Sequence, residues 1–427
     1  MSGAAGRSLA VFPGGSLGEY DLPPDLALVL ARGAGAQVWD SEGRAFTDFT
    51  MGWGSAILGH AHPAVVEAGQ RQAALGANFA YVTEPALALA EEIVRAVACA
   101  ERVRFCASGT EATSYAVRLA RAFTGRPKIL KFEGAYHGAN EVGTVSLFPR
   151  RLLDFPLGEP TSAGLGPGAA ADVLVAPYND LRSTVAILEA HRHELAGIIV
   201  EPLHRCTSPL PGFLQGLREA TAEMGLLLIF DETVTGFRLA YGGAQEYYGV
   251  RPDLATLGKG LGGGYPIGAV AGRGDILELV REDRLGDPRY VWFASSLGGN
   301  PVSTAAACAT LGELRKPGTY GHLFALGESL RAGLRRVLQD VGVTAQVQGD
   351  GPLAAVVFTD REVVDYRTAF ASNRALARAY LLGLFRRGIF LNPMSTKLYL
   401  SLAHTEADIA RFLRAAQASL EEARGVA

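Results

Sequence analysis

One lysine of this chain lies in a glycine-rich turn between two apolar runs. The stretch reads Leu254-Ala-Thr-Leu-Gly-Lys259-Gly-Leu-Gly-Gly-Gly264-Tyr-Pro-Ile-Gly-Ala. It predicts a strand that delivers an amine to the end of a sheet, followed by a tight backbone turn with room for a close neighbour. The chain has five lysines, and we expect Lys259 alone to lie in apolar surroundings, where desolvation favours the neutral, nucleophilic amine.

Several interpretations of this stretch compete. A Walker A loop requires Ser or Thr after its lysine, and Gly260 stands there instead. Residues 258–263 match GxGxxG, but that motif must open a helix, and Pro266 with a second apolar run indicates a strand. A glycine turn with an incidental lysine and a lysine that forms a Schiff base both remain open.

The elements around this lysine predict an α/β fold. Between Val103 and Ala271, short apolar runs alternate with helical segments, which is typical of a mostly parallel sheet with helices on both faces. The expected strands are 103–106, 128–132, 173–176, 197–200, 226–230, 255–257 and 267–271, and the expected helices are 110–123, 181–192 and 212–224.

Polar residues follow several of these strands at their carboxyl ends, where ligands bind in open α/β sheets. Ser108-Gly109-Thr110 opens a helix and could hold a phosphate or only cap the helix. Asp231 ends the most apolar strand, as a partner for a protonated ring nitrogen or as a structural ion pair. Tyr136-His137 could present a flat aromatic face, and Glu201 closes another strand, as site support or as a cap.

One cofactor would use all of these groups together. Pyridoxal 5′-phosphate (PLP) needs a lysine for its imine, an acid at its pyridine nitrogen, an aromatic ring beside its own ring and a phosphate cup. Once a substrate amine displaces it, Lys259 is the natural base to move the proton of the carbon that bears the amine.

Composition predicts a soluble, cytoplasmic protein. The 427 residues are 48% apolar and 19% charged, with a net charge of −3, and no basic stripe points to nucleic acid or membrane. The N-terminus lacks a basic region followed by a long apolar core, and no segment reaches the roughly 18 apolar residues of a membrane span. The four cysteines are widely spaced and the histidines form no ligand cluster, so we expect reduced thiols and no metal.

The remaining segments predict a smaller α+β domain. Residues 1–35 look like loop, 38–49 like a β-hairpin, and the C-terminal region alternates helices near 322–339, 371–387 and 405–423 with short strands. We expect a segment 1–55 that packs with the small domain, a large domain at 56–305 and a C-terminal small domain at 306–427. The Pro/Gly-rich stretch 155–171 is predicted to be a long loop.

The chain resembles the class III aminotransferase family of fold-type-I PLP enzymes, and within it the glutamate-1-semialdehyde 2,1-aminomutases. The match runs over most of the chain. It includes Ser108-Gly-Thr-Glu-Ala112, Lys131-Phe-Glu-Gly-Ala-Tyr-His-Gly138, Val200-Glu-Pro202, Asp231-Glu-Thr-Val-Thr-Gly-Phe-Arg238, Thr256-Leu-Gly-Lys259, Gly299-Asn-Pro301 and Ala403-His-Thr405.

The resemblance implies a role for each of these positions. Lys259 is the Schiff-base lysine, Asp231 the partner of the pyridine nitrogen and Tyr136 the residue stacked on the ring. The positions around the cofactor are Ser108, Gly109, Thr110, His137, Glu201 and Thr233, and Ser295 or Ser296 reaches the phosphate of the neighbouring subunit. The family's active sites lie at a dimer interface, which implies a homodimer.

The chain departs from the aminomutases where they read their substrate. Residues 13–20 offer no arginine for the substrate carboxylate, Lys397 lies where a glutamate is expected, and Leu203-His-Arg-Cys206 replaces a longer loop. Because the cofactor residues are kept and the substrate readers are changed, we expect a ping-pong aminotransferase acting on an amino donor and a keto acid or aldehyde. The alternative is an isomerase, either an aminomutase or a racemase. Candidate substrate contacts are Trp53, Tyr81, Arg205 and Lys397.

Overall fold

The chain forms two compact units. The computed structural model describes residues 4–18, 20–166 and 168–424. One unit contains the described residues of Met1–Pro63, Pro317–Val363 and Thr368–Ala427, and the other contains those of Ala64–Lys316 and Val364–Arg367. We call them the small unit and the large unit. The domain bounds 1–55, 56–305 and 306–427 stay a prediction.

The strands and helices of both units have the following bounds. The strands are β1 (Leu30–Ala34), β2 (Gln37–Asp40), β3 (Ala45–Asp48), β4 (Arg102–Cys106), β5 (Lys128–Phe132), β6 (Val173–Ala176), β7 (Leu195–Val200), β8 (Leu227–Asp231), β9 (Leu254–Leu257), β10 (Gly268–Gly272), β11 (Gln346–Gln348), β12 (Leu353–Val357), β13 (Ile389–Phe390) and β14 (Leu398–Tyr399). The α-helices are α1 (Ala4–Val11), α2 (Met51–Gly54), α3 (Pro63–Ala73), α4 (Glu84–Ala96), α5 (Gly109–Thr124), α6 (Glu141–Thr144), α7 (Leu181–His191), α8 (Phe213–Glu223), α9 (Ala244–Tyr248), α10 (Gly274–Leu277), α11 (Pro301–Leu314), α12 (Thr319–Val341), α13 (Tyr366–Phe370), α14 (Arg374–Arg386) and α15 (Glu406–Arg424).

The large unit is built on one mixed sheet. Its strand order is β4-β10-β9-β8-β7-β5-β6, with β10 antiparallel to both of its neighbours and the pairs from β9 to β6 parallel. Since β4 and β9 are both antiparallel to β10, β4 runs in the same direction as the parallel strands. The segments that follow β4, β5, β7, β8 and β9 therefore leave the sheet at the same edge, as the sequence predicts.

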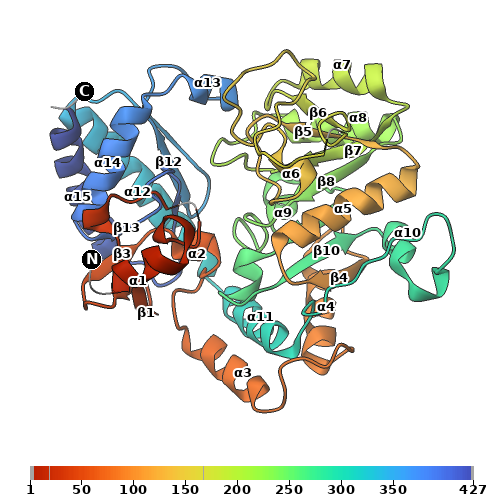
Figure 1. Cartoon of the computed structure of the whole chain (residues 1–427), viewed down its shortest axis with the longest axis horizontal. Coiled ribbons are helices and arrows are strands. Elements are labelled where there is room, and N and C mark those ends of the chain that lie inside the picture. Colours follow the sequence, from red (N-terminus) through yellow and green to blue (C-terminus); the bar gives the residue numbers. More distant parts are fainter. Residues whose placement is uncertain (1–3, 19, 167, 425–427) are drawn as a thin grey trace. The chain divides into compact units, whose positions relative to one another are not determined.

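Successive side chains of these strands point alternately into two apolar cores, one on each face of the sheet. Ile129, Ile199 and Ile229 pack with residues of α5 on one face. Their neighbours along the same strands, such as Leu130 and Leu228, pack with α7 and α8 on the other face. Figure 1 shows α7 and α8 together on one side of this sheet. The continuous apolar strands of the sequence are explained by burial on both faces.

The small unit contains two short sheets and three long helices. The sheets have the orders β1-β2-β3-β13 and β11-β12-β14. The sheet β11-β12-β14 forms a core with α12, α14, α15 and Ile389 of β13. Val38, Phe46 and Phe390 of the other sheet form a second cluster with Phe385 of α14. The expectation that residues 1–35 are loop is wrong for two segments, since α1 and β1 lie there. β1 is stabilised by its pairing with β2. The apolar pattern of residues 30–34 is too weak to predict this strand from the sequence.

A short segment of the C-terminal part of the chain packs in the large unit. Val364–Arg367 belongs to that unit, although residues on both sides of it belong to the small unit. Arg367 donates from Nε and an Nη to both carboxylate oxygens of Glu133 at 2.8 and 3.1 Å. The ring of Tyr366 lies against Gly134, where a Cβ would come within 2.3 Å of it. This segment therefore anchors the start of the loop that carries Tyr136.

The stretch 155–171 is irregular, as predicted: among its described residues there is no helix or strand, only an isolated bridge from Pro160 to Val145. Within the part of the chain that the structure describes, no helix is both long and apolar enough to cross a membrane.

Candidate active site

The segment Ser108–Thr110 lies at the start of α5. Ser108 caps this helix, since its Oγ accepts the backbone N–H of Glu111 at 3.2 Å. Ala112, Ala116 and Leu119 hold the helix against the sheet because they are fully buried. The aligned backbone N–H groups at the start of a 16-residue helix present partial positive charge, which suits a phosphate.

The carboxylate of Asp231 is fixed on both oxygens. Oδ1 accepts the backbone N–H and the hydroxyl of Thr233 at 3.1 and 2.6 Å and the hydroxyl of Thr256 at 2.9 Å. Oδ2 lies 2.8 Å from Nδ1 of His137. Burial acts to raise the pKa of Asp231, but the hydrogen bonds from His137 and Thr233 outweigh it and hold the pKa below 3.8. The group is therefore an anion at neutral pH, ready to pair with a protonated ring nitrogen.

The backbone around Tyr136 and His137 is held by side chains of neighbouring elements. Glu201 Oε1 accepts the backbone N–H of Tyr136 at 3.2 Å. The carbonyl of His137 accepts from the hydroxyl of Thr113 at 2.6 Å. A Cβ at Gly138 would lie 2.7 Å from Cα and Oγ1 of Thr110, so this glycine lets the loop approach the start of α5. The loop that carries Tyr136 and the segment Ser108–Thr110 therefore lie side by side.

Lys259 lies in a turn just beyond β9. Its φ is 44°, a left-handed conformation that costs energy for any residue with a side chain, and such strain gathers at functional sites. A Cβ on Gly258 would lie 3.3 Å from Thr233 Cγ2 and 3.8 Å from Gly109 Cα. The lysine turn, the segment after Asp231 and the start of α5 thus meet at one place.

One expectation about the lysines is wrong. Lys259 is partly exposed, whereas Lys131 is the lysine that is completely buried. Lys131 Nζ donates to the carbonyls of Ala135, Gly143 and Val145 at 3.1, 3.2 and 2.6 Å. Burial lowers the pKa of this ammonium to about 7, while the charge of Glu201 acts to raise it. The three carbonyls belong to residues 135–145, a segment that contains Tyr136 and α6, so Lys131 holds the two ends of that segment together.

Two threonines, Thr233 and Thr256, bind the carboxylate of Asp231. The hydroxyl of Thr233 binds Asp231, and its methyl faces Gly109, where a Cβ would come within 2.7 Å of Cγ2. Thr256 and Lys131 were missed as site residues. A polar residue inside an otherwise apolar strand was the available signal for both.

Ser295 and Ser296 lie near the start of α5 of their own chain. Ser295 Oγ donates to Glu111 Oε2 at 2.8 Å. Ser296 is exposed, and its carbonyl accepts from Asn78 Nδ2 at 3.0 Å. This contact brings the segment around Tyr81, which is 85% exposed, next to the serines. Their predicted reach to a neighbouring subunit stays a prediction.

The candidate substrate residues fall into different units. Arg205 lies in the large unit, with its guanidinium carbon 5.7 Å from the ring centre of Tyr136. Trp53 and Lys397 lie in the small unit, where Trp53 packs edge-on against Tyr20 and Lys397 Nζ is 5.2 Å from the ring centre of Tyr399. Their roles in substrate binding stay predictions.

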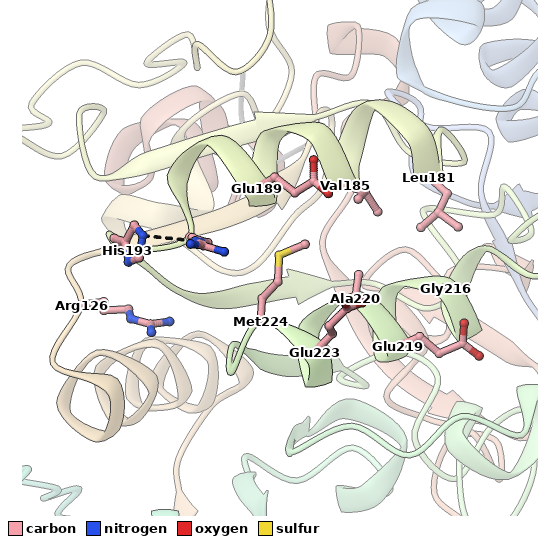
Figure 2. A pocket seen from close by; sticks show the side chains of 11 residues that line it. Arg126, Leu181, Val185, Glu189, His193, Gly216, Glu219, Ala220, Glu223 and Met224 are labelled. Carbon is pink, nitrogen blue, oxygen red and sulfur yellow. Dashed lines mark hydrogen bonds between the residues drawn. The ribbon is translucent and has the colours of Figure 1, made fainter.

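A groove of about 590 Å³ lies elsewhere in the large unit, between α7 and α8. Figure 2 shows Leu181, Val185 and Glu189 projecting from α7 and Glu219, Ala220 and Glu223 from α8. None of the predicted site residues lines it. Among the described residues, no three His, Cys, Asp or Glu side chains are grouped so that they could hold a metal ion.

The residues of the strand edge fit PLP. The glycines at 109 and 258 leave space around Thr233 that a Cβ would fill, next to the backbone N–H groups at the start of α5. Ser108, Gly109 and Thr110 would hold the phosphate, Asp231 the ring nitrogen, and Lys259 the carbonyl carbon of the cofactor.

Comparison with known proteins agrees with this chemistry. Residues 22–417 match the model of class III aminotransferases. The glutamate-1-semialdehyde 2,1-aminomutase of Pelotomaculum thermopropionicum is 42% identical over 92% of this chain and 90% of its own. The structure of an omega-transaminase from Sphaerobacter thermophilus has a TM-score of 0.92 and 37% identity, covering 99% of this chain and 97% of its own. A transaminase with PLP bound has a TM-score of 0.89 and 31% identity, with 99% and 97% covered.

These matches confirm the predicted family, the α/β fold with a mostly parallel central sheet, and PLP as the cofactor. The chain therefore belongs to the class III aminotransferase family of fold-type-I, PLP-dependent enzymes.

Proposed function

We propose that this enzyme is an aminotransferase that moves an amino group between an amino donor and a keto acid or aldehyde in a ping-pong cycle. The observation that carries the proposal is the register of β8 and β9. Asp231 pairs with Thr256, so the anionic carboxylate and the turn of Lys259 lie at the ends of adjacent parallel strands. The residues of amino-group chemistry are thus kept, while positions at which the aminomutases read their substrate differ.

PLP, when bound, supplies a carbonyl that condenses with amines and a ring that draws electrons from the carbon bearing the amine. Lys259 would hold the cofactor, and its Nζ, once freed by a substrate amine, would accept and donate the proton of the carbon that bears the amine. Asp231 would keep the ring nitrogen of the cofactor protonated. His137, which shares Oδ2 of Asp231, keeps that carboxylate oriented and charged.

An amino-group half-reaction tests the proposal. The purified holoenzyme is mixed with amine donors in the absence of any acceptor, and the absorbance of the cofactor is followed. An aminotransferase loses the band of the lysine-bound cofactor with a donor and regains it when a keto acid or aldehyde is added. If no donor discharges this band while a single substrate is isomerised, the proposal is wrong.

The second candidate is an isomerase of the aminomutase type. It is favoured by the curated relatives at 40–42% identity, which are named glutamate-1-semialdehyde 2,1-aminomutase. An aminomutase would convert one substrate without consuming a second one. Product analysis of single-substrate incubations distinguishes the two candidates.

We also propose that the enzyme is a homodimer with shared active sites. Large apolar side chains are exposed on two neighbouring segments of the large unit: Leu75, Phe79, Tyr81, Val82, Trp292 and Leu297. The contact from Asn78 to Ser296 joins these segments. Exposed apolar area of this kind commonly marks a protein interface. Analytical ultracentrifugation tests the proposal, and a monomeric mass at micromolar concentration would contradict it.

A further inference from the structure

Arg205 is held rigidly beside the aromatic residue of the site. It follows β7, and its φ of 63° places the backbone in the left-handed region. Its backbone N–H donates to Glu201 Oε2 at 3.0 Å, and its Nε donates to the carbonyl of Gly134 at 3.0 Å. The guanidinium carbon lies 5.7 Å from the ring centre of Tyr136 and 4.6 Å from that of Phe148. Both the backbone and the side chain are therefore fixed before any ligand arrives.

The guanidinium lacks a counter-ion within the described structure. Its recorded contacts are the carbonyl of Gly134 and the two aromatic rings, and Nη2 is buried with no hydrogen-bond partner among the described residues. Glu201 is already engaged, because its oxygens accept the backbone N–H groups of Tyr136 and Arg205. The same carboxylate also acts on the charge of Lys131.

We propose that Arg205 binds the carboxylate of the amino donor and acceptor, so that the substrates are amino acids and keto acids and not simple amines and aldehydes. This inference rests on the proposed aminotransferase function. The planar fork of an arginine matches a carboxylate, and a cation kept partly from water gains most from such a partner. The residue as a whole is partly exposed, although its Nη2 is buried. The exposed ring of Phe148 gives this subsite an apolar wall.

A different role for Arg205 makes a different prediction. If its contacts with Gly134 and Tyr136 only support the aromatic residue, its loss would weaken the reaction of every donor equally. A carboxylate subsite affects only donors that carry a carboxylate. Matched pairs of donors separate these roles: alanine with ethylamine, and 3-aminobutyrate with isopropylamine.

The test uses the holoenzyme and the variants Arg205→Leu, Arg205→Lys and Arg192→Leu. Arg192 is an exposed arginine at the end of α7 and serves as the matched control. We expect Arg205→Leu to raise the amino acid concentration for half-maximal discharge of the cofactor by about 10- to 100-fold, and Arg205→Lys by less. Ethylamine and isopropylamine should change by less than about twofold, as should all donors with Arg192→Leu. Equal effects of Arg205→Leu on both members of each pair would overturn the proposal.

A second measurement does not depend on turnover. Propionate is titrated calorimetrically into cofactor-free wild type and Arg205→Lys, with propionamide as the uncharged control. We expect propionate to bind the wild type more tightly than propionamide, and this preference to fall in the variant. If no donor discharges the cofactor but this preference is present, the aminotransferase proposal fails and the carboxylate subsite stands. If the preference is absent from the wild type, the subsite is wrong.

Discussion

Nδ1 of His137 lies 2.8 Å from Oδ2 of Asp231 in a buried pair at the end of β8. Because an ionised carboxylate only accepts hydrogen bonds, Nδ1 carries a proton and donates it to Oδ2. The other carboxylate oxygen is occupied by Thr233 and Thr256. The charge of Asp231 is thus set by protein groups before the cofactor binds.

The substitution Asp231→Asn tests the importance of this charge. The amide side chain would carry no negative charge opposite the ring nitrogen, and we expect kcat to fall by roughly 10²- to 10⁴-fold while Lys259 still holds the cofactor. Steady-state kinetics and the absorbance of the bound cofactor measure the two effects. Asp180→Asn is the control, since Asp180 only caps α7 and Asn caps a helix equally well. Near-normal turnover in Asp231→Asn would refute the role.

Lys259→Ala should remove the covalent attachment of the cofactor. We expect kcat to fall by at least about 10³-fold, because both the anchoring amine and the proton carrier are lost. Borohydride reduction followed by mass spectrometry should find the cofactor fixed to the wild type and to the exposed-lysine control Lys316→Ala, but not to Lys259→Ala. Full turnover of Lys259→Ala would exclude this lysine as the catalytic one.

Gly109→Ala should weaken cofactor binding. The new Cβ would lie 2.7 Å from Thr233 Cγ2, so either Thr233 or the start of α5 must move. Equilibrium titration of the cofactor-free protein with PLP should give a dissociation constant at least about 10-fold higher, the effect of losing about one hydrogen bond to a charged group. Gly312→Ala in α11 is the control, because nothing lies within 4 Å of its Cβ and alanine favours a helix. Unchanged affinity in Gly109→Ala would show that this space is not part of the site.

His204 should make the fold sensitive to acid. Burial lowers its pKa from 6.5 to about 4, so the unfolded chain binds a proton at a pH where the folded chain does not. The stability from the neutral ring is complete above about pH 6.5 and is lost as the pH falls toward 4. His204→Phe keeps a ring stacked on Tyr178 and removes this titration.

Urea unfolding at pH 7 and pH 4.5 measures the effect. Between these values the wild type should lose roughly 2 kcal/mol more stability than His204→Phe. His404, whose pKa burial also lowers to about 4, contributes equally to both proteins and cancels. Identical losses in the two proteins would contradict the prediction.

The sequence predicts best what depends on local pattern. Lys128–Phe132 and Val173–Ala176 are strands with the expected bounds, because each is an apolar run buried on both faces. The polar residues at the strand ends meet as expected, since parallel strands bring their carboxyl ends to one edge. β13 illustrates what is harder to predict: it is two residues long and pairs with β3, more than 300 positions earlier in the chain.

In the candidate site, too, contacts between segments far apart in the sequence could not be predicted. Lys259 was predicted as a site residue from the glycines around it, and that role stays a prediction. The burial of Lys131 depends on three carbonyls that only the folded chain brings together. The hydroxyl of Thr256 has a partner because β8 and β9 are in register, which no sequence pattern states. The burial of Lys131 and the hydrogen bond of Thr256 depend on contacts between different helices, strands and loops, and residue type alone does not predict such contacts.

The ion pair of Arg367 with Glu133 restricts how this enzyme can be divided or recombined. Glu133 is 4% exposed, and its guanidinium partner arrives from beyond residue 363. A fragment that ends at Lys316 would contain Lys259 but would leave the buried carboxylate of Glu133 without its cation, which costs several kcal/mol. A chimera that takes residues 64–316 from one relative and the rest from another must therefore carry a cation at position 367 to pair with the carboxylate at position 133. Without this pair, we expect the part formed by residues 64–316 to fold poorly, even if all its other contacts are complete.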